Sequence, residues 1–198
     1  METLEALRIE LGIAKLNLIG ESWGSMLALL YSSKYPENIN KILLTAAVGL
    51  KSDDYLSFGT DLENRLTSEE KGKFNGLVEA LSKGEVDVQE IFKIIDKYYV
   101  FNQEALEWKT PTKSNAEINK YLGQDIIKNY DLTGKKHLLK NVPILIAQGD
   151  HDIKQPSMLQ ESLLRFIPHA QLEVIQECGH WSVVEKPYEL MKIIKEFF

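Results

Sequence analysis

A serine between two glycines, in the stretch Gly-Glu-Ser-Trp-Gly at residues 20–24, constrains the fold of this chain more than any other segment. An apolar run with the character of a buried strand precedes it, and a run with helical periodicity follows it. So tight a strand-to-helix turn needs glycine where a side chain would collide with neighbouring backbone, which we expect at both Gly20 and Gly24. The turn would hold Ser22 in a strained conformation, with its hydroxyl exposed at the edge of a sheet.

A hydroxyl is a weak nucleophile near neutral pH, so a reactive Ser22 needs a base and a group that orients the base. Two later strands end in candidates. The apolar run at residues 142–147 leads into Gly-Asp-His-Asp at residues 149–152, and a short strand near residue 174 leads into Cys-Gly-His-Trp at residues 178–181. Because the carboxyl ends of parallel strands share one edge of a sheet, these groups can converge. The predicted fold class is therefore α/β, a mostly parallel sheet with flanking helices.

The three motifs, in the order Ser, Asp, His, resemble the α/β-hydrolase superfamily from residue 4 to residue 198. The tryptophan after the serine and the long helical middle of the chain make it most similar to the proline iminopeptidase branch. The resemblance implies a serine hydrolase that transfers an acyl group to water, with Ser22, His180 and Asp152 as its catalytic triad. The family's acid ends a Gly-x-x-Asp stretch, which maps to Asp152, while Asp150 remains the alternative.

Members of this family carry several strands and a loop of His-Gly-Gly-Pro-Gly type ahead of the nucleophile, and the loop supplies part of the oxyanion hole. No such loop occurs in this sequence, where residues 1–19 have room for one helix and one strand. The resemblance therefore implies a partial α/β-hydrolase fold in which the Trp23 N–H is the remaining oxyanion donor. One alternative to an active serine hydrolase is that the chain has impaired activity or is a non-catalytic remnant of such an enzyme. The strand before Ser22 would have a free edge, so we expect self-association or pairing with a separate amino-terminal segment.

The middle of the chain, residues 50–140, lacks the alternation typical of strands and is predicted to be helical. Three spacings in it are typical of helix starts: Thr67-x-x-Glu70, Asp87-x-x-Glu90 and Ser114-x-x-Glu117. We expect this segment to form a helical cap, inserted into a core made of residues 1–49 and 141–198. A cap over the edge of the sheet would exclude water and shape the substrate pocket.

In proline iminopeptidases, carboxylates of the cap bind the free amine of the substrate. The resemblance offers Glu104, Glu107 and Glu117 for this role, although a solvated helix surface explains these glutamates at least as well. Trp181, next to His180, is expected to form a wall of the pocket. The implied substrate is thus a short peptide with a free amino terminus, and a small-molecule ester, whose hydrolysis needs no such carboxylate, is the alternative.

Composition argues against several other classes. The chain has 23 Lys and Arg against 29 Asp and Glu, a net charge of −6, and no basic cluster that would favour nucleic acid as a partner. It contains no apolar run of membrane-spanning length and no signal-peptide pattern, so we expect a cytoplasmic protein without a membrane partner. Cys178 is expected to be a buried structural cysteine. Asp-His-Asp at residues 150–152 lacks a second ligand cluster, and we expect neither a metal nor a cofactor.

Overall fold

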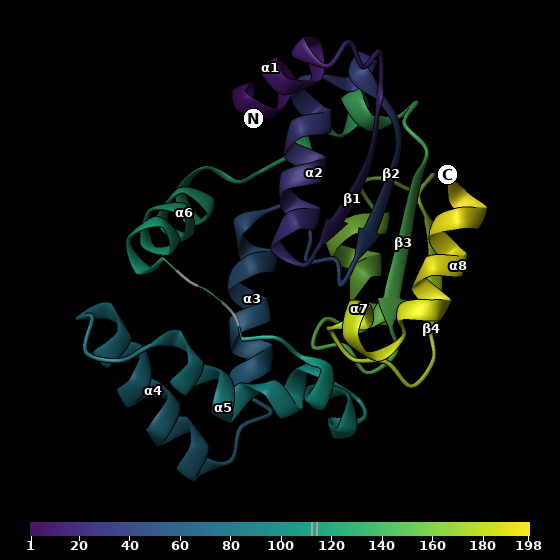
Figure 1. Cartoon of the computed structure of the whole chain (residues 1–198). Coiled ribbons are helices and arrows are strands. Elements are labelled where there is room, and N and C mark those ends of the chain that lie inside the picture. The colour runs from purple at the N-terminus through teal and green to yellow at the C-terminus, as the bar shows by residue number, and fades with distance from the viewer. Residues whose placement is uncertain (112, 114) are drawn as a thin grey trace.

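A computed structural model describes residues 1–111, 113 and 115–198 of the chain. Its described residues form a parallel four-stranded sheet with the strand order β1 (Leu16–Glu21), β2 (Ile39–Thr45), β3 (Ile144–Gly149) and β4 (Gln171–Ile175). Helices flank this sheet (Figure 1). The predicted α/β class with a parallel sheet is thereby confirmed.

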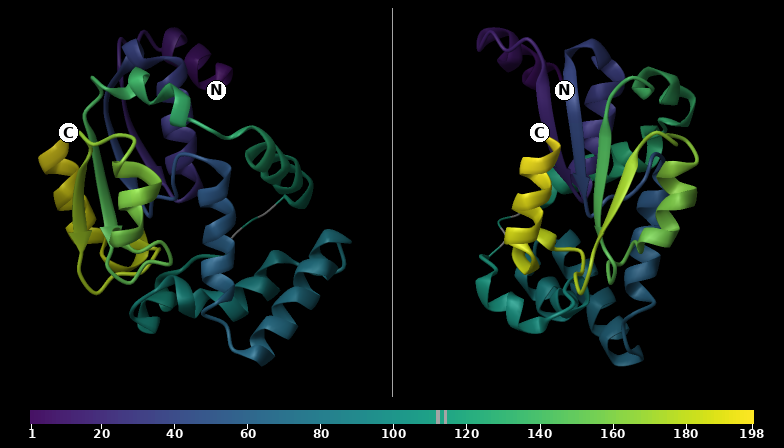
Figure 2. Two further views of the ribbon diagram at one scale, coloured as in Figure 1. Left: turned by 180° about the vertical axis from the view of Figure 1, so that it is seen from behind. Right: turned by 90° about the vertical axis from the view of Figure 1, so that its right-hand side faces the viewer.

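Alternate residues of the central strands face opposite sides of the sheet, and both sides are apolar. Ile42 and Leu44 of β2 belong to a core cluster that includes α2 (Trp23–Lys34), whereas Leu43 belongs to a cluster that includes α8 (Pro187–Phe197). Figure 2 shows these two helices on opposite sides of the sheet. Continuous apolar strands are typical of parallel sheets covered on both faces, because each residue then meets a helix whichever way it points.

Strand β1 forms one edge of the sheet. It pairs with β2 from Leu16 opposite Ile39 to Glu21 opposite Thr45, and no further strand from the described part of the chain lies on its other side. Ile19 in this strand is 53% exposed. An exposed strand edge offers unpaired backbone groups to other chains. The uptake of a second copy or of a separate amino-terminal segment at this edge stays a prediction.

Helices occupy the chain between β2 and β3: α3 (Ser52–Glu63), α4 (Ser68–Ser82), α5 (Val88–Tyr99), the 3₁₀ helix η2 (Gln103–Trp108) and α6 (Ala116–Asn129). The two ends of this segment are hydrogen-bonded to each other. Ser52 N–H donates to the Tyr130 carbonyl (2.8 Å), and Leu132 N–H donates to the Leu50 carbonyl (2.9 Å). The chain thus leaves and rejoins the core at one place. We propose that residues 50–140 are an inserted cap, whose α4 and α5 lie toward the carboxyl ends of the strands (Figure 1).

Two of the three predicted helix starts are confirmed. The Thr67 hydroxyl accepts a hydrogen bond from Glu70 N–H (3.3 Å), and the Glu70 carboxylate accepts one from Thr67 N–H (2.9 Å), which together cap α4. Asp87 accepts a backbone N–H at the start of α5 (2.9 Å). The third predicted residue, Ser114, lies outside the described residues. Asn115 is the N-cap of α6.

Shorter elements complete the chain: α1 (Glu2–Glu10), η1 (Pro36–Asn38), η3 (Thr133–Leu139), η4 (Pro156–Met158), the π-helical turn η5 (Gln160–Leu164) and α7 (Ser182–Glu185). Among the helices of the described residues, none has the length and apolar character needed to cross a membrane.

The burial of the central strands predicts a difference between two isoleucines of the same sheet. Ile146 in β3 is 0% exposed, so Ile146→Ala leaves a cavity and is expected to lower the free energy of unfolding by about 2–5 kcal/mol. Ile19→Ala, the same change on the exposed edge, is expected to cost less than about 1 kcal/mol. Urea unfolding followed by circular dichroism measures both, and equal losses would contradict this placement of the core.

Candidate active site

Ser22 lies in the turn between β1 and α2, in a conformation that residues other than glycine rarely adopt. Its φ is 51° and its ψ is −119°. Hydrogen bonds hold the turn on both sides: Ser22 N–H donates to the Thr45 carbonyl of β2 (2.9 Å), while the Ser22 carbonyl accepts from the N–H (2.9 Å) and the hydroxyl (2.6 Å) of Ser25. Because the surrounding structure fixes the residue in this way, the backbone strain persists.

The two glycines of the turn are needed to different degrees. A Cβ atom on Gly20 would lie 2.4 Å from the carbonyl oxygen of Gly24, so no side chain fits there. A Cβ atom on Gly24 would meet no atom of the described residues within 4 Å. The expectation of a collision is therefore wrong for Gly24, because this residue lies in the first turn of α2 with its Cβ direction toward open space.

His180 lies between Ser22 and Asp152. Its Nε2 is 2.8 Å from the Oγ of Ser22, and its Nδ1 is 2.9 and 3.1 Å from the two carboxylate oxygens of Asp152. The three residues follow β1, β4 and β3, and so they meet at the carboxyl edge of the parallel sheet. The structure brings together the three side chains that the motifs indicated, and it places Asp152, not Asp150, against the imidazole.

Fixed donors orient the Asp152 carboxylate. Lys154 N–H donates to its Oδ1 (2.9 Å), and the side-chain amide of Gln148 donates to its Oδ2 (2.9 Å). Gln148 is held in turn by Ala47 N–H, which donates to its Oε1 (2.7 Å). Asp152 and Gln148 are both fully buried, where polar groups must be hydrogen-bonded. Gln148 was not among the residues expected at the site, although a polar residue in an otherwise apolar strand was a usable signal.

Asp150 and Cys178 lie near His180 in the structure but do not contact its imidazole through hydrogen bonds. Oδ1 of Asp150 is 2.7 Å from Nδ1 of His151 and accepts a hydrogen bond from Cys178 N–H (3.1 Å). The Cys178 thiol is buried, and this burial raises its pKa to about 12. A thiol with such a pKa stays uncharged at neutral pH and is a poor nucleophile. Both residues therefore support the loop around His180.

Two aromatic rings from the proposed cap enclose the imidazole. The ring centres of Phe58 in α3 and Tyr99 in α5 lie 4.8 and 5.2 Å from that of His180. The backbone N–H of His180 also donates to the Tyr99 carbonyl (2.7 Å), as does that of Trp181 (3.2 Å). With 1% of its surface exposed, His180 is shielded from water by these contacts.

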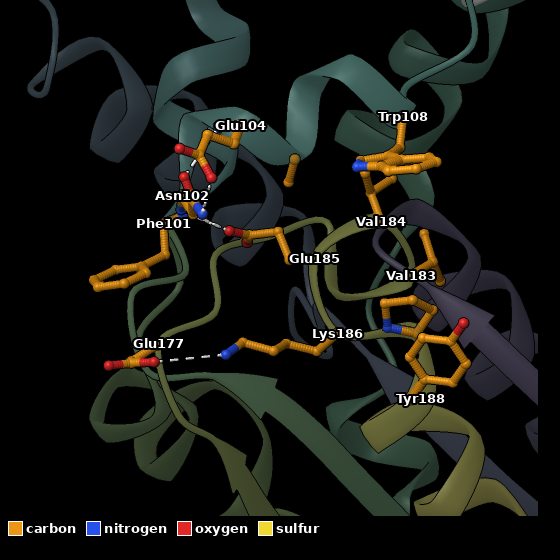
Figure 3. A pocket seen from close by; sticks show the side chains of 12 residues that line it. Phe101, Asn102, Glu104, Trp108, Glu177, Val183, Val184, Glu185, Lys186 and Tyr188 are labelled. Atoms are coloured by element: carbon orange, nitrogen blue, oxygen red, sulfur yellow. Dashed lines mark hydrogen bonds and ion pairs between the residues drawn. The ribbon is translucent and has the colours of Figure 1, made fainter.

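Glu185 in α7 connects the loop of His180 with the cap (Figure 3). Its Oε1 accepts hydrogen bonds from the backbone N–H groups of Phe101 (2.7 Å) and Asn102 (2.9 Å). Its Oε2 accepts one from the N–H of Gly179 (2.6 Å). One carboxylate thus holds the residue before His180 and the chain just after α5. The role of Glu185 was not visible in the sequence, because its partners are backbone groups of a distant segment.

Two cavities of about 540 Å³ each meet at Ser22 and Tyr99. The first extends along α3. Trp23, Tyr55, Leu56, Phe58 and Leu62 are among its lining residues, and Glu63 lines it as well. The second extends toward η2 and α7, with Glu21, Phe92, Trp108, His180 and Trp181 among its lining residues. A molecule bound at the Ser22 hydroxyl can therefore extend in two directions, one along α3 and one toward η2 and α7.

The residues expected in the pocket lie in different places. Trp181, the expected wall of the pocket, lines the second of these cavities, and Trp23, the expected oxyanion donor, lines the first. Glu104 is exposed in a third cavity of about 640 Å³, beside the Glu185 contacts (Figure 3). Glu107 and Glu117 are also exposed. As the structure describes them, none of these three glutamates lines either cavity at Ser22.

The residues at the site supply a hydroxyl, an imidazole, carboxylates and aromatic rings. No group of three or more His, Cys, Asp or Glu side chains that could hold a metal ion is found within residues 1–111, 113 and 115–198. In the Asp-His-Asp stretch at residues 150–152, Asp152 faces His180, whereas Asp150 faces His151.

Comparisons with known proteins agree with this architecture. A family model described as the alpha/beta hydrolase fold matches residues 2–187. The proline iminopeptidase of Lactobacillus helveticus is 26% identical over 216 residues, covering 100% of this chain and 70% of that protein. An alpha/beta fold family hydrolase from Bacillus anthracis has a TM-score of 0.68 at 23% identity, covering 100% of this chain and 72% of that one. The proline iminopeptidase of Mycobacterium smegmatis has a TM-score of 0.66 at 16% identity, covering 98% and 68%.

The bonds of Glu185 predict a local effect of its substitution. Glu185→Gln replaces one of the two acceptor oxygens by an NH2 group, which cannot accept a hydrogen bond from a backbone N–H. It is therefore expected to lower the free energy of unfolding by roughly 1–3 kcal/mol and to speed hydrogen exchange at Gly179, Phe101 and Asn102. Glu104→Gln, which changes an exposed carboxylate in the neighbouring cavity, is the matched control and is expected to change neither. Hydrogen exchange of the three amides is measured by NMR. Unchanged protection of all three in Glu185→Gln would contradict the role of Glu185 in holding the residue before His180 to the chain after α5.

Proposed function

The chain belongs to the α/β-hydrolase fold family, and we propose that it is a serine hydrolase in which Ser22, His180 and Asp152 form the catalytic triad. The observation that carries the proposal is the continuous line of contacts from the Ser22 hydroxyl through both nitrogens of His180 to Asp152, at 2.8 and 2.9 Å. A hydroxyl, an imidazole and a buried carboxylate in this order are the requirements for activating a serine.

In the first half of the reaction, Ser22 Oγ attacks the carbonyl carbon of the substrate and gives its proton to Nε2 of His180. Asp152 accepts the Nδ1–H of the ring, which fixes the tautomer, and stabilises the imidazolium that forms. The tetrahedral intermediate then expels its leaving group, which takes the proton from Nε2. In the second half, water attacks the acyl-serine with His180 as the base again, and the acid product leaves with Ser22 restored.

The backbone N–H of Trp23 supports this mechanism as an oxyanion donor. Trp23 is the first residue of α2, and the first N–H groups of a helix have no partner within the helix and carry partial positive charge. The helix also begins directly after the nucleophile, so this N–H would lie near a carbonyl that Ser22 attacks. In other hydrolases one such donor is worth about a hundred- to a thousand-fold in turnover.

The proposed substrate is a short peptide or amino-acid amide with a free amino terminus. This finer assignment is supported by curated relatives named proline iminopeptidase at 22–26% identity, over 100% of this chain. A short-chain ester is a second candidate. It is favoured by the exposed positions of Glu104, Glu107 and Glu117, away from the cavities at Ser22.

The proposed nucleophile predicts a labelling pattern. A fluorophosphonate probe is expected to modify Ser22, as located by peptide mass spectrometry, and the label is expected to disappear in Ser22→Ala and in His180→Ala. Ser68→Ala, which removes an exposed hydroxyl at the start of α4, is expected to label like the parent protein. A folded protein that takes up no label would instead support a non-catalytic remnant of the fold.

The two nearby carboxylates are expected to differ in their effect on turnover. Asp152→Asn removes the group that fixes the tautomer of His180 and is expected to lower kcat about 10³–10⁴-fold. Asp150→Asn, two residues away and directed at His151, is expected to change kcat less than about ten-fold. Hydrolysis of a proline arylamide and of a short-chain nitrophenyl ester measures both variants and separates peptidase from esterase. The opposite order of the two variants would move the role to Asp150.

A further inference from the structure

The side chain of Lys154 is a buried cation that the mechanism above does not use. Lys154 lies in the loop after β3, close behind Asp152 in the chain, and only 4% of its surface is exposed. A lysine is rarely buried to this extent without partners, because removing an ammonium from water is costly. The groups around Lys154 therefore indicate what its buried charge holds in place.

The ammonium of Lys154 is bound by helix α3 of the proposed cap. Its Nζ donates a hydrogen bond to Ser57 Oγ (2.7 Å), and the Ser57 hydroxyl donates in turn to the Asp54 carbonyl (3.0 Å). Nζ also lies 3.8 Å from Oδ2 of Asp61. That oxygen is shielded from solvent and accepts no hydrogen bond from the described residues. The charge of Lys154 therefore offsets the burial of an acceptor that has no donor of its own.

The backbone of the same lysine holds the carboxylate of Asp152. Lys154 N–H donates to Oδ1 of Asp152 (2.9 Å). The Lys154 carbonyl accepts from the side-chain amide of Gln148 (2.7 Å), which also donates to Oδ2 of Asp152 (2.9 Å). Arg65 is a second link from the cap to this loop, but it donates to the carbonyl of Asp152 (2.6 Å). The direction of the carboxylate therefore depends on where the backbone of Lys154 lies.

Ser57, which accepts the hydrogen bond of the ammonium, lies in α3 between two residues of the site. Phe58 packs on the imidazole of His180 at a ring-centre distance of 4.8 Å, and Leu56 lines the first cavity at Ser22. Consecutive residues of a helix keep fixed positions relative to one another, so one position of α3 places all three side chains. The contact through the Ser57 hydroxyl therefore ties the loop of the acid to the helix that covers the base.

We propose that Lys154 is a positioning residue of the triad: its buried ammonium, held by α3, fixes the backbone N–H that aligns Asp152 with His180. This inference rests on the proposed serine hydrolase. A displacement of about 1 Å in a catalytic group can cost about a hundred-fold in rate, so a fixed carboxylate has a large effect on turnover. Lys154 lines neither cavity at Ser22. It is therefore expected to act on the alignment of the imidazole and not on the binding of substrate.

Lys154→Met tests the proposal, because methionine keeps an unbranched side chain and removes the charge. Its kcat is expected to fall about 10–100-fold, with KM within about three-fold of the parent value, on both the proline arylamide and the nitrophenyl ester. The rate of fluorophosphonate labelling of Ser22 is expected to fall by the same factor as kcat. Lys73→Met, which removes an exposed ion pair with Glu69 in α4 (2.7 Å), is the matched control and is expected to change none of these values.

A proton resonance reports the alignment without requiring turnover. The proton on Nδ1 of His180 is held by the Asp152 carboxylate, and we expect it to give a resolved downfield signal in the NMR spectrum of the parent protein. In Lys154→Met this signal is expected to broaden or disappear through exchange with water. The backbone amide at position 154 is expected to exchange at least ten-fold faster. A lysine that only stabilised the fold would lower Tm and leave both signals unchanged.

A second variant separates positioning from the balance of buried charge. Lys154→Met leaves the shielded oxygen of Asp61 without its counter-charge, so the variant is expected to have a lower Tm. Adding Asp61→Asn removes that charge and is expected to restore part of the Tm, which also provides folded protein if the single variant is unstable. The kcat and the His180 signal of the double variant are expected to stay as low as in Lys154→Met. Recovery of the parent kcat would show that Lys154 only balances Asp61, and would overturn the proposal.

Two further results would overturn the role of Lys154. One is an unchanged kcat in Lys154→Met, and the other is a rise in KM alone, because the lysine would then shape the pocket instead of the triad. The proposed hydrolase is judged separately, on the parent protein. A parent that takes up no label at Ser22 would refute the hydrolase, and the His180 signal would still show whether Lys154 aligns Asp152. A labelled parent with the same labelling rate in Lys154→Met would refute the role of Lys154 alone.

Discussion

The parallel alignment of the four strands is the constraint on which the site depends. Parallel strands place every following connection at the same edge, and here three of those connections carry Ser22, Asp152 and His180. The alignment is kept by packing on both faces, because β2 and β3 present apolar residues alternately to α2 and α8. A shift of β3 by one residue would exchange its two faces and move Asp152 by about 3.3 Å. The packing that fixes the register of β3 therefore also fixes the distance between Asp152 and His180.

The helical insertion is part of the site as well as a cover over it. Its residues touch the loops of His180 and Asp152 at several points: Tyr99 accepts from the backbone of His180, Phe58 packs on the imidazole, and Arg65 donates to the carbonyl of Asp152 (2.6 Å). Glu185 holds the chain after α5 to the residue before His180. A movement of α3 or α5 would consequently move the imidazole or its surroundings. In the proposed hydrolase, the opening of the pocket and the position of the imidazole are therefore physically coupled.

Local patterns predicted the parts of the structure that local physics determines. The turn at Ser22, the buried strands and the cap of α4 by Thr67 each depend on a few consecutive residues, and they were found from the sequence. The choice between Asp152 and Asp150 came from the family pattern, since two carboxylates so close together differ in direction and not in context. Gln148 and Glu185 depend on backbone groups about 100 and 80 residues away. Contacts at such separations follow from the assembled fold, which periodicity and spacing do not encode.

The paired ends of the insertion have a consequence for how such a chain can diversify. Bonds between residues 50–52 and 130–132 close the insertion at a narrow neck, so its exit and return points stay fixed whatever lies between them. Such a neck is a natural junction for grafting, because a different helical module can replace the present one while the sheet keeps its register. The replacement would have to meet two requirements. It would need a carbonyl that accepts from the backbone N–H of His180, and backbone N–H groups that donate to Glu185. Chimaeras that meet both would exchange the lining of the pocket while retaining the arrangement of Ser22, His180 and Asp152.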